Sequence, residues 1–169
     1  MTSLRRIGFF LALAFLMIPA MPVQDLLAAQ VSPDGFDPAE VSRKAEAAMN
    51  AKDFTEAARL YRELDQRFPG IAGLKMNLGM ALYFSGNPSG ALEPLQTATE
   101  MDPSLESAWF FSGMSCMETG RASAAVDDFK EYLRRKPIDY DARLIYADAL
   151  ASLQRNEEAV QEYQQLRRL

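Results

Sequence analysis

The sequence contains no histidine and only one cysteine, Cys116, among its 169 residues. Without histidine, the chain lacks the side chain most often used as a general base or as a metal ligand. A single cysteine excludes an intrachain disulfide and any zinc site built from several cysteines. These absences favour a protein without catalytic or metal chemistry, so we expect no enzyme activity, no cofactor and no bound metal.

Extremes of composition are missing as well. With 9 glycines, 9 prolines and 49% apolar residues, the chain has neither the low hydrophobicity of a disordered sequence nor the bias of a fibrous one. Its 18 basic and 23 acidic residues give a net charge of −5, which argues against binding to a nucleic-acid backbone. The length is sufficient for one domain with a buried core. Composition therefore predicts a globular protein whose partners are not nucleic acids.

The N-terminal segment differs from the rest of the chain. Two arginines precede an uncharged run over residues 7–24, which prolines interrupt and small residues follow. This order predicts a secretory signal peptide over residues 1–29, cleaved after Ala29 or, as the second choice, after Ala20. The alternative is an uncleaved anchor helix, because the uncharged run is near the lower length limit of a membrane span. Residues 30–37 then form a polar linker rich in proline and glycine.

A 34-residue repeat occupies the remainder of the chain, residues 38–169. Four columns of residues share this period: small residues at Ala57, Ala91, Ala125 and Ala159; prolines at Pro69, Pro103 and Pro137; bulky apolar residues at Tyr61, Leu95, Phe129 and Tyr163; and small residues at Ala45, Gly79, Gly113 and Ala147. Four independent columns with one period exclude chance. They indicate stacked copies of one structural unit.

This pattern resembles the tetratricopeptide repeat family, whose signature the third unit carries most fully, at Trp109, Gly113, Gly120, Ala125, Phe129 and Pro137. The resemblance implies an all-α fold: a right-handed α-solenoid of about four helix-turn-helix units, preceded by the signal peptide or anchor helix. The units span residues 38–71, 72–105, 106–139 and 140–169. Within each unit, small residues at the eighth and twentieth positions let two helices approach, and the bulky residue at the twenty-fourth position fills the space between them.

Glycine, proline and capping residues predict where these helices begin and end. Gly86 and Gly120 mark the turns between paired helices, while Asn87 and Asp139 are the expected N-caps of the helices that follow them. Pro94 lies inside the second helix of the second unit, where it removes a backbone hydrogen bond. We expect a kink at Pro94 and not a break.

The first helices of the second and third units carry two apolar faces where a surface helix needs one. At about 100° per residue, one face is formed by core positions such as Leu78, Gly79 and Leu82. The opposite face is formed by Met76, Met80, Tyr83 and Phe84 in the second unit and by Phe110, Met114 and Met117 in the third. In the resembled family this second face lines a concave groove that binds a peptide or helix. The alternative is that part of it packs on the neighbouring unit.

The groove hypothesis identifies Phe84 and Phe110 as anchors, because aromatic side chains bury a large area at a small entropic cost. Both are expected on the face opposite the repeat core, whereas Trp109 is expected within that core. A clamp for a C-terminal carboxylate, known from some members of the family, is not expected. Ser42, Glu46, Ser107 and Phe111 stand at the positions where such a clamp places most of its polar and basic residues.

The resemblance implies a non-catalytic protein–protein interaction module. It further implies an exported, bacterial-type adaptor of the cell envelope, which is located in the periplasm or secreted. The alternative is a subunit of an envelope assembly or secretion complex that is anchored in the inner membrane. The protein contacts the membrane only if residues 1–29 are retained. The expected partner is a segment of another protein. The fourth unit ends without an additional capping helix, so self-association through its open face is a further expectation.

Overall fold

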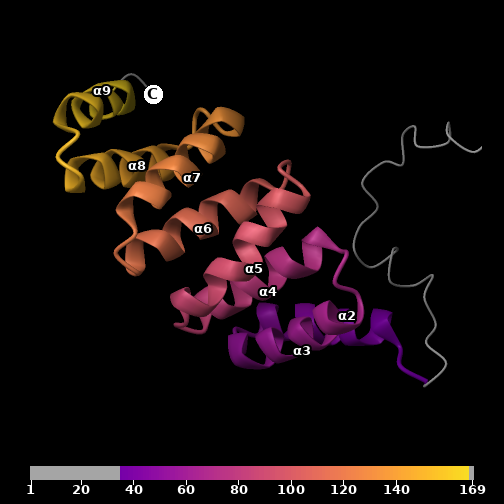
Figure 1. Cartoon of the computed structure of the whole chain (residues 1–169). Helices are drawn as coiled ribbons and strands as arrows, with labels where there is room; N and C mark the ends of the chain where they lie inside the picture. Colours follow the sequence, from indigo (N-terminus) through magenta and orange to yellow (C-terminus); the bar gives the residue numbers. More distant parts are fainter. Residues whose placement is uncertain (1–34, 168–169) are drawn as a thin grey trace, which may run out of the picture.

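Within residues 35–167, the part of the chain that this computed structural model describes, there are eight α-helices and no strand. The helices are α2 (Pro38–Asn50), α3 (Phe54–Arg67), α4 (Ala72–Phe84), α5 (Pro88–Met101), α6 (Glu106–Glu118), α7 (Ala122–Arg135), α8 (Tyr140–Ser152) and α9 (Asn156–Leu166). They form four consecutive pairs, and they succeed one another from α2 at one end of the molecule to α9 at the other (Figure 1). The all-α prediction is confirmed. The predicted signal peptide and its alternative, the anchor helix, lie outside the described residues.

The pairing of small and bulky columns is confirmed by contacts inside the second and third units. A Cβ atom added at Gly79 would lie 2.4 Å from Cγ of Leu95, and one added at Gly113 would lie 2.9 Å from Cζ of Phe129. Both distances are too short for nonbonded carbon atoms. In these two units the paired helices therefore approach as closely as they do because glycine occupies the eighth position.

The turns between paired helices repeat one backbone conformation. Gly86 and Gly120 have φ angles of 81° and 73°, as expected for glycine that ends a helix. Lys52 and Gln154 occupy the same position in the first and fourth units, with φ angles of 61° and 58°. The left-handed turn is thus a property of every unit, and two units adopt it without glycine.

Side-chain caps fix the starts of four helices. Asn87 accepts a hydrogen bond from the Gly90 N–H at 2.9 Å, and Asp139 accepts one from the Ala142 N–H at 3.0 Å, so both predicted caps are confirmed. Asp37 and Asp53 cap α2 and α3 in the same way.

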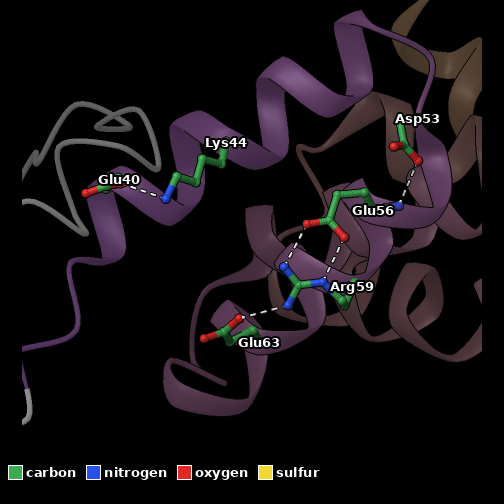
Figure 2. A network of polar contacts seen from close by, with 6 residues as sticks. All are labelled: Glu40, Lys44, Asp53, Glu56, Arg59 and Glu63. Atoms are coloured by element: carbon green, nitrogen blue, oxygen red, sulfur yellow. Dashed lines mark hydrogen bonds and ion pairs between the residues drawn. The ribbon is translucent and has the colours of Figure 1, made fainter.

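Figure 2 shows the Asp53 cap together with exposed ion pairs on α2 and α3, formed by Glu40 with Lys44 and by Arg59 with Glu56 and Glu63. Pairs so exposed add little to stability.

Helix α5 continues through Pro94 to Met101, and the proline ring is buried. The helix is therefore not broken, as predicted. The expected kink stays a prediction.

The core forms two apolar clusters along the array. The first is built around side chains of α3, α4 and α5, including Leu64, Leu74 and Leu95, and the second around side chains of α7 and α8, including Phe129 and Leu150. All five are fully buried. Each cluster joins side chains of consecutive helices, as expected for a repeat array in which each helix pair packs on the next.

The expectation that Trp109 belongs to the core is wrong in part, because its side chain is only half-buried. Its Nε1–H donates a hydrogen bond to the Pro103 carbonyl at 3.0 Å, and the Arg135 guanidinium lies 5.4 Å from the ring centroid. The polar edge of the indole needs a partner, and the nearest one is at the surface of the link between units. Phe129, which has no polar atom, fills the interior instead.

Arg143 ties the last helix pair together. Its side chain is buried, and it donates hydrogen bonds to Glu162, to Gln165 at 2.8 Å and to the Pro137 carbonyl at 2.6 Å. One cation thereby joins α8 to α9 and to the preceding link. A buried guanidinium requires such partners, because leaving it unpaired would be costly.

Candidate binding site

Five aromatic rings contact one another in series across three of the four units. Phe54 at the start of α3 stacks on Phe84 at the end of α4, with ring centroids 5.1 Å apart. Phe84 contacts Phe111 of α6 at 5.1 Å, Phe111 contacts Phe110 at 5.3 Å, and Phe110 contacts Tyr132 of α7 at 5.1 Å. We call Phe54, Phe84, Phe111, Phe110 and Tyr132 the aromatic row. These spacings are those of favourable aromatic pairs.

The aromatic row is accessible to a partner. The Phe84 side chain is 42% exposed, and the other four rings are half-buried.

Tyr83 packs beside the row, with its ring 5.5 Å from Phe111, and its hydroxyl donates a hydrogen bond to Glu118 at 2.6 Å. Burial and this hydrogen bond raise the pKa of Tyr83 to about 12, so the phenol stays protonated. The contact holds α4 against α6 and thereby fixes the rings of the two helices relative to each other.

The row ends in a cavity of about 330 Å³. The cavity is lined by Ser107, Phe110, Phe111, Tyr132, Asp139 and Asp141. Three of these residues belong to the aromatic row, so the row and the cavity form one continuous surface. This volume is at the lower end of the range for ligand pockets.

The two carboxylates at the mouth of the cavity have different surroundings. Asp139 caps α8 with Oδ1, and its Oδ2 accepts a hydrogen bond from the Tyr132 hydroxyl at 2.7 Å. Burial, together with Asp139 and Glu106, raises the pKa of Tyr132 to about 12. Asp141 is exposed and has no hydrogen-bond or ion-pair partner within residues 35–167. The cavity therefore combines aromatic walls with one engaged and one free carboxylate.

The residues predicted for the groove separate into two groups. Tyr83, Phe84 and Phe110 lie in or beside the aromatic row. The four methionines are partly buried side chains: Met76 packs on the first core cluster, Met114 and Met117 pack on the second, and Met80 is half-buried on α4. The binding role of all seven stays a prediction.

The sequence predicts Phe110 on the face opposite the core, and the structure shows that this is wrong in part. Its ring contacts the fully buried Phe129 at 6.0 Å and packs on the second core cluster. The reason is that α7 lies beneath α6 on this side, so a ring at position 110 reaches both the cavity and the core. In the described part of the chain, the rings that Phe84 contacts are those of Phe54, Tyr83 and Phe111, all of them half-buried. Phe84 is the more exposed of the two predicted anchors.

Sequence reasoning missed Phe54, Phe111 and Tyr132 as parts of the site. The sequence identifies Phe111 only as a residue that does not fit a carboxylate clamp. The available signal was the occurrence of two adjacent aromatic pairs, Tyr83–Phe84 and Phe110–Phe111, on consecutive first helices. Phe54 and Tyr132 lie on second helices, α3 and α7, outside the apolar faces that periodicity predicts on the first helices.

Cys116 is the one cysteine among the described residues, and it is buried. Burial and the neighbouring Asp128 raise the pKa of the Cys116 thiol to about 11, which keeps it protonated and unreactive. No three potential metal-ligating side chains gather within residues 35–167. In the same range, none of the helices is both long and apolar enough to cross a membrane.

Comparison with known proteins agrees with this geometry. The family model described as "Tetratricopeptide repeat" matches residues 76–137 and 112–169. A stretch of 91 residues is 32% identical to the Protein SGT1 homolog of Oryza sativa subsp. japonica, covering 52% of this chain and 25% of that protein. The chain thus spans about a quarter of the length of this curated relative.

Solved structures show the same fold. One structure of the MamA protein aligns with a TM-score of 0.74 at 20% identity, over 86% of this chain and 80% of that one. Another MamA structure aligns with a TM-score of 0.72 at 19% identity, over 86% and 83% of the two chains. Identities this low establish the likeness of fold alone.

Fold and site together define a helical-repeat scaffold that presents an apolar surface. The chain belongs to the tetratricopeptide repeat family, since the family model covers more than half of it. This family consists of non-catalytic modules that bind other proteins.

Proposed function

We propose that this protein is a non-catalytic adaptor that binds a peptide or helical segment of another protein on the aromatic row. The observation that carries the proposal is the row itself: five rings in contact, half-buried or exposed, which lead into an open cavity. Exposed aromatic surface of this kind marks interaction sites. Aromatic side chains also dominate the binding energy of protein interfaces.

Rigid support of the row favours binding over incidental exposure. The Tyr83–Glu118 hydrogen bond joins α4 to α6, and the Tyr132–Asp139 hydrogen bond joins α7 to the start of α8. Rings held in place before binding lose little conformational entropy when a partner covers them. An apolar centre fixed in this way suits recognition of a short segment.

Photo-crosslinking in living cells tests the proposal. A photoreactive amino acid replaces Met80, which is half-buried on α4, the helix that carries Tyr83 and Phe84. The control places the same group at Gln96, an exposed position on α5. We expect a defined partner captured from position 80 and not from position 96. Identical products from both positions, or none from position 80, would contradict the proposal.

We further propose that the adaptor is exported and acts in the cell envelope. The support is the sequence of residues 1–29, with its arginines, uncharged run and small residues. The competing proposal, a membrane-anchored subunit of an envelope assembly or secretion complex, retains that segment. Mass spectrometry of the protein purified from its host distinguishes them: export with cleavage removes residues 1–29, and an anchor leaves the full mass in the membrane fraction.

A further inference from the structure

On α4, α6 and α8, the first helices of the second to fourth units, the basic side chains have ion-pair partners and most of the acidic side chains do not. These helices carry two cations, Lys75 and Arg143, and each is held by a carboxylate of a second helix. Lys75 Nζ lies 3.1 Å from Asp65 Oδ1 of α3, and Arg143 pairs with Glu162 of α9. Neither cation is free to meet a ligand.

The charges left over on the same helices are all negative. Glu118 and Asp148 are exposed and accept hydrogen bonds only from neutral tyrosine hydroxyls, and Asp141 is exposed without a partner in the described range. Glu106 is neutralised by Lys136 at 3.0 Å. A segment lying along these helices therefore meets an apolar surface bordered by uncompensated carboxylates. Charge complementarity favours a segment that carries positive charge.

The cavity at the end of the aromatic row offers aromatic rings and carboxylates to a positively charged side chain of such a segment. Phe110, Phe111 and Tyr132 supply three aromatic rings, and an aromatic face attracts a guanidinium or an ammonium. Asp139 and Asp141 supply carboxylates at the same cavity. An anionic group would face both carboxylates without a cation to pair with. A neutral side chain would leave the free carboxylate of Asp141 without compensation.

We propose that this cavity receives the basic side chain, arginine or lysine, of the bound segment, while apolar residues flanking that side chain cover Phe84 and Phe54. This proposal rests on the proposed function and specifies the partner's chemistry: an amphipathic segment with at least one cation set among apolar residues. Arginine fits better than lysine, because its planar guanidinium stacks on rings and pairs with carboxylates at the same time.

The test uses the full chain and a random linear peptide library displayed on phage. We expect the enriched peptides to contain arginine or lysine next to apolar residues. An enriched peptide is then synthesised with its arginine replaced by citrulline, which keeps the shape and removes the charge. Fluorescence polarisation should show affinity reduced about tenfold by citrulline, the combined effect of a lost ion pair and a lost cation–π contact.

Matched variants locate the effect. Asp141→Asn should weaken binding of the arginine peptide about three- to tenfold and leave the citrulline peptide unaffected. Glu157→Gln is the control, because it removes an exposed carboxylate from the first turn of α9, away from the cavity. Equal affinity for the arginine and citrulline peptides, or equal effects of the two variants, would overturn the proposal.

The outcomes also separate this proposal from the proposed function. Peptides that bind in a Phe84-dependent manner without a basic residue would refute the cation site and leave the adaptor function intact. Enrichment of no peptide at all would refute both.

Discussion

At the scale of single residues, two turns carry a side chain where glycine is preferred. Lys52 and Gln154 hold φ angles of 61° and 58°, at the positions that glycine fills in the second and third units. A side chain in this conformation costs about 1–2 kcal/mol, partly offset by the greater freedom of glycine in the unfolded chain. We therefore expect Lys52→Gly and Gln154→Gly each to raise the free energy of unfolding by about 0.5–1 kcal/mol. Urea denaturation measures the free energy of unfolding of each variant. Gly86→Ala is the control and should lower that free energy, because it places a side chain in the same conformation. If neither glycine substitution raises the free energy of unfolding, the turns are unstrained.

Asp128 is a second residue with a predictable effect on stability. Its side chain is largely buried and accepts a hydrogen bond from Ser112 at 2.6 Å, and burial raises the pKa of its carboxyl from 3.8 to about 6. Between these pH values the folded chain keeps a proton that the unfolded chain has lost. Its contribution is therefore most favourable below about pH 4, declines as the pH rises to about 6, and then stays constant.

Replacement of Asp128 by asparagine should remove this dependence. We expect Asp128→Asn to be more stable than the wild type at pH 7, by about 1–2 kcal/mol, with the advantage vanishing near pH 4. Chemical denaturation over pH 4–8 measures the difference between the two proteins. Asp127→Asn, on the exposed neighbour, should show no such trend. A constant difference between Asp128→Asn and the wild type would contradict the assignment.

At the scale of helices, the close approach within the α4–α5 and α6–α7 pairs depends on glycine at the eighth position. In Gly79→Ala the new methyl group would lie 2.4 Å from Leu95 Cγ, which is not the flexible end of that side chain. The helices must separate or Leu95 must leave its rotamer, so we expect a loss of about 1–3 kcal/mol. Gly70→Ala is the control, because a Cβ atom there meets nothing within 4 Å. Thermal melts of the two variants should differ clearly, and equal melting temperatures would refute the packing argument.

The helices could be predicted from the sequence because each signal was local and repeated. The 34-residue columns located the helix pairs, and the caps at Asn87 and Asp139 depend on neighbours three residues away. The aromatic row could be predicted only in part, since Phe54, Phe111 and Tyr132 enter it through contacts between units. Helical periodicity places Phe110 on one face of α6. It does not reveal that α7 lies close enough for the same ring to reach Phe129.

At the scale of the whole molecule, a repeat array transmits a local disturbance only to its neighbours. Arg143→Ala removes the cation that joins α8 to α9 and to Pro137, and it leaves Glu162 without its partner. Hydrogen exchange should therefore accelerate in α8 and α9 while α2 to α5 keep their protection. Mass spectrometry of peptides from the exchanged protein measures this. Equal acceleration along the chain would show that the array unfolds as a single cooperative unit.

The central claim is that the aromatic row binds a segment of another protein, and that its exposed ring, Phe84, contributes more to binding than to the stability of the scaffold. The most direct measurement compares binding and melting of Phe84→Ala and Phe110→Ala, with a peptide taken from the segment cross-linked at position 80. Phe84→Ala should weaken binding by about 1–3 kcal/mol and lower the melting temperature less than Phe110→Ala does, because Phe84 contacts only partly buried rings. Phe110→Ala should lose both binding and stability, because its ring also contacts Phe129. If Phe84→Ala binds as tightly as the wild type, or melts as early as Phe110→Ala, the account is wrong.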